Sequence, residues 1–214
     1  MKKIIFFDVD TQYDFINPKG KLYVKGAEKI IKNLRFLTGF AEKNNIPIIS
    51  SVDAHSTDDP EFRRFPAHCI CGTAGQKKIK ETRLKGAVYI PAGKGSSGTG
   101  RYSEKKLSGL LTRAGQIVFE KKTIDAFSNP DLKKVLSGVK TAYVYGVATE
   151  YCVKAAVSGL RKNRIETYVI RDAIRAAGRK DGMRALSQMK KKGAKFIKVA
   201  EIPKLLGGKQ DGKG

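Results

Sequence analysis

Short apolar runs alternate with longer amphipathic segments along this chain. The apolar runs predict buried strands over 4–9, 46–54, 116–121, 143–147, 166–170 and 195–200. The amphipathic segments carry apolar residues at a helical spacing and predict helices over 26–44, 129–137, 150–162 and 178–192. This order predicts an α/β fold in which helices cover both faces of a mainly parallel sheet.

Two segments lack such periodicity. Residues 91–104 are rich in glycine and serine but lack the phosphate-loop pattern, so we expect a mobile surface loop or lid there. Residues 207–214 predict a disordered tail. The rest of the chain, residues 1–206, is expected to form a single domain.

The composition is that of an ordinary globular protein, with 41% hydrophobic and 29% charged residues in a chain of 214. No apolar run approaches the about 20 residues that span a bilayer, and Asp8 interrupts the first run too early for a signal peptide. We therefore expect a cytoplasmic protein with no membrane partner. The three cysteines, Cys69, Cys71 and Cys152, are too unevenly spaced for a disulfide framework.

The formal net charge of +23 is large for this length. Residues 151–214 hold 17 Lys and Arg against 5 Asp and Glu. Such a balance favours nucleic acid or another anionic partner, although a solvated basic surface would give the same composition. Since no nucleic-acid-binding motif accompanies the charge, we expect no nucleic-acid partner.

Cys152 follows the predicted strand 143–147 and lies in the first turn of the next helix. Unpaired N–H groups and the helix dipole at this position favour a thiolate and could receive an oxyanion. Cys152 is therefore a candidate nucleophile, although a cysteine in a strand–helix turn can equally be a packing residue.

Two further strands end at candidate partners for this cysteine, Asp10 and Lys121. In a parallel sheet the carboxyl ends of the strands share one edge, which is where ligands bind. Asp10 could take the thiol proton and return it to a leaving amine, and Lys121 could hold the charges in place. By composition alone, Lys122 is a rival for the second role.

The only two histidines of the chain lie near an aspartate at a strand end. Asp53 and His55 follow the second strand, and His68 comes from the next loop. Oxygen and imidazole ligands of this kind suit zinc or iron, and Glu61 could add a fourth ligand. Either histidine alone could instead be a surface residue.

Five segments in this order resemble the isochorismatase-like cysteine hydrolases, and within them the nicotinamidases most closely. They are DVDTQYDF, SVDAH, FPAHC followed by GT, EKKTIDAF and YGVATEYCV. The resemblance extends over about residues 3–200 and implies a three-layer α/β/α sandwich. It also implies that the segment at about 86–116 is an insertion, longer than in compact nicotinamidases.

The resemblance further implies a role for each matching residue. The catalytic set falls on Asp10, Lys121 and Cys152, and the metal ligands fall on Asp53, His55 and His68, with a further ligand near Glu61. A cis peptide falls between Val147 and Ala148, and the oxyanion donors are the N–H groups of Ala148 and Cys152. The residues that hold the substrate ring are Phe15 and Phe65, with Tyr151 reaching the pocket.

The first functional hypothesis is a nicotinamidase, which converts nicotinamide and water to nicotinate and ammonia through a thioester on Cys152. Its cofactor would be one divalent ion, with zinc expected and iron or manganese as alternatives, bound to the pyridine nitrogen. The second is a related cysteine hydrolase acting on another small amide, carbamoyl or ureido substrate. The third, a basic nucleic-acid-binding protein on this fold, is disfavoured because Asp10, Lys121 and Cys152 are all present. We also expect a homo-oligomer.

Overall fold

A computed structural model describes residues 4–93 and 100–207, and a parallel sheet forms its centre. Within these residues the sheet has seven strands in the order β3-β4-β2-β1-β5-β6-β7, and every neighbouring pair is parallel. The strands are β1 Ile4–Val9, β2 Ile48–Asp53, β3 Val88–Ile90, β4 Gln116–Lys121, β5 Thr141–Val147, β6 Glu166–Arg175 and β7 Lys195–Ile197. This architecture confirms the predicted α/β class.

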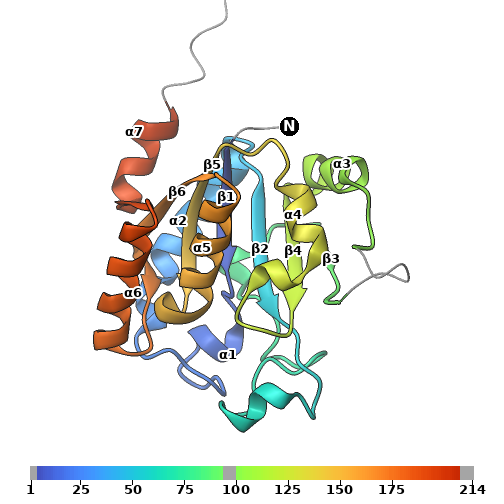
Figure 1. The fold of residues 1–214 in the computed structure, drawn as a ribbon, viewed down its shortest axis with the longest axis vertical. Coiled ribbons are helices and arrows are strands. Elements are labelled where there is room, and N and C mark those ends of the chain that lie inside the picture. Colours follow the sequence, from blue (N-terminus) through green and yellow to red (C-terminus); the bar gives the residue numbers. More distant parts are fainter. Residues whose placement is uncertain (1–3, 94–99, 208–214) are drawn as a thin grey trace, which may run out of the picture.

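Helices cover both faces of the sheet and give the molecule three layers (Figure 1). The core on one face includes residues of α3 Glu104–Ala114, α4 Pro130–Val135, α5 Lys154–Lys162 and α6 Arg179–Lys191. The core on the other face includes residues of α1 Tyr13–Ile16, α2 Ile31–Lys43 and α7 Ile202–Leu206. Both faces are thus buried, which is why the central strands are almost continuously apolar.

The first strand shows how alternate side chains are divided between the two cores. Phe7 and Val9 point into the layer with α3 to α6, whereas Phe6 points into the layer with α2. Asp8 shares the face of Phe6 and is buried there, where it forms a 2.6 Å ion pair with Lys78. This ion pair holds the segment that follows His68 against β1.

The segment 86–116, expected to be an insertion with a loop, contributes β3 at the sheet edge and α3 over it. Ser103 accepts a hydrogen bond from the Lys106 N–H at the start of α3, and Gly115 ends the helix at a φ of 68°. Residues 94–99 of the predicted loop and residues 208–214 of the predicted tail lie outside the described residues.

The sequence pattern also placed some boundaries wrongly. The sixth strand continues to Arg175 rather than ending at 170, although the charged Arg171 and Asp172 interrupt its apolar run. A register shift between Val144 and Gly146 in β5 lets the pairing resume beyond them. The short helices α1 and α7 were not predicted, since neither is long enough to show a helical period.

The fold brings the carboxyl ends of four neighbouring strands, β4, β2, β1 and β5, to one edge of the sheet. Lys121 and Asp53 end β4 and β2, Asp10 follows β1, and Cys152 follows β5. Among the described residues, no helix is both long and apolar enough to cross a bilayer.

Candidate active site and metal centre

Cys152 lies at the point where β5 passes into α5. The peptide bond between Val147 and Ala148 is cis, and a π-helical turn over Thr149–Val153 follows it. The Ala148 carbonyl accepts hydrogen bonds from the N–H groups of Tyr151, at 3.1 Å, and Val153, at 3.2 Å. The cysteine is therefore held in the first turn before α5, as its sequence position predicted.

Gly146 allows β5 to approach β1 directly before this turn. Its φ is 116°, a conformation that favours glycine, and an added Cβ would lie 2.0 Å from the carbonyl oxygen of Val9. No other residue type could occupy this position without displacing β1. The close approach sets the distance between Cys152 and the residue that follows β1, Asp10.

Asp10 is fully buried and has a positive φ of 48°. Its N–H donates to the Ser51 carbonyl at 3.1 Å, and the Ser51 hydroxyl donates to Asp10 Oδ1 at 2.6 Å. Asp10 Oδ2 lies 2.9 Å from Lys121 Nζ. Two residues from neighbouring strands thus fix both carboxylate oxygens of Asp10.

Lys121 lies between the candidate catalytic residues and the candidate metal ligands. Its ammonium group contacts Asp10, donates to Asp53 Oδ1 and donates to Cys152 Sγ at 3.6 Å. Burial alone would lower the pKa of Lys121, but the Asp10 and Asp53 carboxylates outweigh it and raise the pKa well above its usual value. Lys121 therefore carries a positive charge inside the protein, whereas Lys122 is exposed.

Burial of Cys152 opposes the thiolate that the helix terminus is predicted to favour. Burial raises the pKa of the Cys152 thiol well above its usual value; Lys121 opposes this shift, but Asp10 and Asp53 add to it. Burial also raises the pKa of Asp10 against the opposing effect of Lys121. The ligand atoms of Asp10 and Cys152 lie within 4.8 Å of each other, which places the carboxylate close to the thiol.

The predicted metal ligands Asp53, His55 and His68 form a buried cluster. Asp53 Oδ2 lies 3.9 Å from His55 Nε2 and 3.8 Å from His68 Nε2, and the three ligand atoms lie within 4.8 Å of one another. Burial would raise the pKa of Asp53, but Lys121 and the two histidines lower it far below its usual value. The cluster therefore offers one carboxylate oxygen and two imidazole nitrogens to a cation.

The second nitrogen of each imidazole is oriented by a separate oxygen atom. His55 Nδ1 lies 3.0 Å from Asp59 Oδ2, and His68 Nδ1 lies 2.8 Å from the Pro66 carbonyl oxygen. Metal-binding histidines characteristically have such partners, which fix the ring and its tautomer. In the described part of the chain neither ring nitrogen of His55 has a hydrogen bond of good geometry, although Asp59 Oδ2 lies near Nδ1, so Nε2 is free to bind a divalent ion.

Glu61 lines the same pocket but is not part of this three-residue cluster. It lies in a short helical turn, Pro60–Arg63, and is half-buried. Burial and the nearby Asp53 carboxylate raise its pKa. The structure thus brings Glu61 near the candidate metal ligands without placing it among them.

A cavity of about 150 Å³ lies over Cys152 and the cluster. The three predicted ring-binding residues line it together with other apolar side chains: Phe15, Leu22, Val24, Phe65, Ile124, Val147, Ala148 and Tyr151. The Phe65 and Tyr151 rings meet edge to face at 5.7 Å, and Phe15 lies 5.4 Å from the His68 ring. Aromatic side chains, the candidate nucleophile and two of the candidate metal ligands therefore line one cavity.

Sequence reasoning missed three residues that orient this site, namely Gln12, Ser51 and Asp59. The Gln12 side chain donates to the Asp53 carbonyl at 2.8 Å and accepts from the Asp53 N–H at 2.7 Å. Gln12 lies in the DVDTQYDF segment, but nothing in that segment reveals its partner 41 residues away. Asp59, four residues after His55, likewise has no distinguishing signal in the sequence.

Comparison with known proteins agrees with this geometry. Residues 5–201 match the family model described as the isochorismatase domain. No curated protein matches the sequence. Among solved structures, a pyrazinamidase of Pyrococcus horikoshii in complex with zinc is 27% identical, covers 92% of this chain and 99% of its own, and superposes with a TM-score of 0.74.

Two more distant structures share the fold. Nicotinamidase from Bacillus subtilis is 23% identical, with 92% of this chain and 100% of that chain covered and a TM-score of 0.72. N-carbamoylsarcosine amidase from Thermoplasma acidophilum is 22% identical, with 94% and 99% covered and a TM-score of 0.72.

Proposed function

The chain belongs to the isochorismatase-like hydrolase family, and from this premise we propose that it is a nicotinamidase that hydrolyses its substrate through a thioester on Cys152. One observation carries the proposal. Cys152 lines the same small aromatic cavity as Asp53 and His68, and His55 completes their three-residue cluster. An amide on an aromatic ring that bears a nitrogen matches both groups at once, because the amide can meet the thiol while the ring nitrogen faces the cluster.

The size of the cavity supports a substrate with a single ring. At about 150 Å³ it is smaller than the roughly 300–1,000 Å³ of typical drug-sized pockets. An apolar cavity of about 150 Å³ is known to hold benzene in another protein. Phe15, Phe65 and Tyr151 would contact the faces and edges of such a ring.

Asp10 performs the proton transfers of the proposed reaction. As Cys152 Sγ forms a bond to the carboxamide carbon, the thiol proton passes to Asp10, and the carbonyl π electrons move to the oxygen. The N–H groups of Ala148 and Cys152 stabilise this oxyanion. When the oxyanion collapses, the C–N bond breaks and Asp10 returns the proton to nitrogen, so ammonia leaves and a thioester remains.

Water completes the turnover. Asp10 takes a proton from water as the water oxygen attacks the thioester carbon. When the C–S bond breaks, Asp10 gives this proton to the Cys152 sulfur, so nicotinic acid is released and the thiol is restored. Throughout both steps Lys121 stays charged between Asp10 and Asp53 and holds the carboxylates in position. Nicotinamide and water are consumed, and nicotinate and ammonium are formed, because ammonia takes up the proton that nicotinic acid loses.

Asp53, His55 and His68 would hold one divalent ion, and zinc suits this donor set, with iron or manganese as alternatives. Bound there, the ion would supply a Lewis acid for a ring nitrogen or a water molecule. Glu61 is proposed as a further ligand because it lines the same cavity.

Ammonia release from nicotinamide, pyrazinamide, benzamide and small ureido compounds tests the proposal, with metal content measured on the same sample. Benzamide is the matched control, because it lacks only the ring nitrogen. We expect kcat/KM for nicotinamide to exceed that for benzamide at least about tenfold, equivalent to about 1.4 kcal/mol. If the protein hydrolyses only the ureido compounds, its substrate is a carbamoyl or ureido compound rather than nicotinamide.

A further inference from the structure

Two grooves meet along α6 at the β7 edge of the sheet. The first, of about 660 Å³, lies between residues 23–29, the end of β6 and the start of α6. The second, of about 610 Å³, lies between α6 and β7. Because both are lined by Arg171 and Leu186, they form one continuous surface feature, the basic trough. Its cationic residues are Lys25, Lys29, Arg171, Arg175, Arg179, Lys190 and Lys195.

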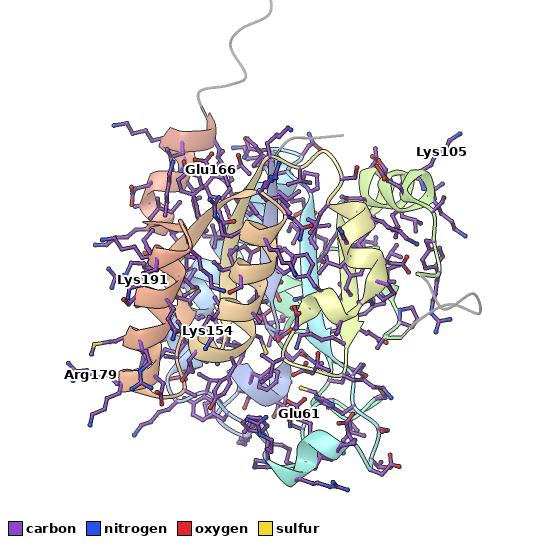
Figure 2. The ribbon with its side chains drawn as sticks, in the orientation of Figure 1. Glu61, Lys105, Lys154, Glu166, Arg179 and Lys191 are labelled. Carbon is purple, nitrogen blue, oxygen red and sulfur yellow. The ribbon has the colours of Figure 1, made fainter. Side chains whose placement is uncertain are left out.

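Among the described residues, six of the seven cations of the basic trough form no ion pair, whereas Lys195 pairs with Glu166. Among its described lining residues one is acidic, Glu28, which accepts a hydrogen bond from the Tyr23 hydroxyl. Within the described part of the chain, Arg171, Arg179 and Lys190 form no ion pair. Figure 2 shows the side chain of Arg179 extending outward from α6, as does that of Lys191 further along the helix.

The length of this surface distinguishes between possible ligands. The 13 residues of α6 extend over about 20 Å, and cations line the trough from Arg179 to Lys190. A small phosphate compound would neutralise only one end. A second copy of this chain would present the same positive charge, and a flat bilayer surface would not follow a concave groove.

A single nucleic-acid strand matches both the length and the shape. A surface about 20 Å long can contact several successive phosphates of one strand. Phe196 and Tyr23 line the walls of the trough, where aromatic rings can stack on bases. We propose that the basic trough binds the phosphate backbone of single-stranded nucleic acid.

This binding surface is separate from the proposed catalytic groups. Among the residues that the structure describes, the trough and the catalytic cavity share two wall residues, Tyr23 and Ala177. The sequence located an excess of cations in residues 151–214, but it could not show which of them share one surface. The fold places segment 23–29 beside the end of β6 and the start of α6, and it places the other end of α6 beside β7. Cations from these separate segments therefore share one surface.

Fluorescence anisotropy with a labelled single-stranded RNA of about 20 nucleotides tests the proposal between about 50 and about 200 mM salt. The variant Arg171→Ala/Arg179→Ala/Lys190→Ala removes three exposed cations of the trough. The matched control, Lys105→Ala/Arg113→Ala/Lys133→Ala, removes three exposed cations from α3 and α4, near the opposite edge of the sheet (Figure 2). Circular dichroism confirms that both variants fold.

We expect the trough variant to raise the Kd at least about tenfold, and to reduce the slope of log K against log salt by about 2, since each phosphate contact contributes about 0.7. The control variant should change the Kd less than about threefold, and amide hydrolysis should be unchanged in both variants. Equal losses in the two variants, or no binding at the lower salt concentration, would overturn the proposal. Tighter binding to anionic phospholipid vesicles than to RNA would also overturn it.

Discussion

At the scale of single residues, the site depends on one buried cation shared by two carboxylates and a thiol. Lys121 contacts Asp10, Asp53 and Cys152, which lie on three other segments of the chain. Because burial makes an unpaired charge costly, these groups depend on one another. In the proposed reaction the proton of Cys152 passes to Asp10.

Replacement of the nucleophile gives the first prediction. Cys152→Ala should lower kcat by about 10⁴-fold or more, because no thioester can form, while the melting temperature changes little. Steady-state ammonia release and thermal unfolding measure the two effects. Cys71→Ser is the control, since Cys71 is exposed and should be dispensable. An active Cys152→Ala variant would remove this residue from the mechanism.

The two adjacent lysines give the second prediction. Lys121→Ala should lower kcat by about 10²–10⁴-fold, because Asp10 and Asp53 lose the cation that positions them. Lys122→Ala should retain kcat within about twofold, since its side chain is exposed. Circular dichroism separates a catalytic loss from unfolding, and the reverse order of the two effects would show that Lys122 is the functional residue.

The candidate metal ligands give the third prediction. His68→Ala should lose the bound divalent ion and raise KM for nicotinamide, because one of the three clustered donors disappears. Glu61→Ala should retain the ion, since water can replace a residue outside the cluster. Metal analysis of the purified variants provides a measurement independent of activity. Full metal content in His68→Ala would contradict the assignment.

At the scale of elements, long periodic segments were predictable and short ones were not. The helix predicted over 178–192 is α6, and the apolar strands β1, β2 and β4 lie within one or two residues of their predicted bounds. Strand β3 has only three residues, too few to show an alternating pattern. Helix α3 was detectable from Leu107, Leu110 and Leu111 and from its caps, but the adjacent glycine-rich segment obscured it.

The candidate site was also predictable only in part. Residues at strand ends could be grouped before the structure was known, because parallel strands place their carboxyl ends at one edge. Asp10, Asp53 and Lys121 are brought together in this way. The residues that orient them, such as Gln12 and Ser51, were not predictable, since their hydrogen bonds join segments distant in sequence.

The junction of β5 and β1 gives the fourth prediction. Gly146→Ala should destabilise the protein by about 1–3 kcal/mol, because its φ is 116° and the new Cβ would meet the Val9 carbonyl oxygen. Gly39→Ala is the control: no atom lies within 4 Å of an added Cβ at this exposed position in α2, so we expect about 0.5–1 kcal/mol of stabilisation. Urea unfolding measures both changes in the free energy of unfolding. An unchanged value for Gly146→Ala would show that β1 can shift to make room for the new Cβ.

At the scale of the whole molecule, the net charge of +23 affects stability as well as binding. Like charges repel one another in the compact state and are further apart in the unfolded chain. The described ion pairs remove little of this repulsion, because the exposed pairs, such as Lys195 with Glu166 and Arg184 with Asp181, are few beside the 43 cations. The folded protein therefore bears an electrostatic cost that salt can screen.

The fifth prediction follows from this cost. The melting temperature should rise as sodium chloride increases to about 0.1 M, where the screening length is about 10 Å, and should then level off. The variant Arg171→Ala/Arg179→Ala/Lys190→Ala should melt at a higher temperature than the unmodified chain at low salt, and its salt dependence should be weaker. Scanning calorimetry without phosphate or nucleic acid measures both effects, and potassium chloride should reproduce them. A melting temperature that falls with salt would mean that attractive ion pairs outweigh the repulsion.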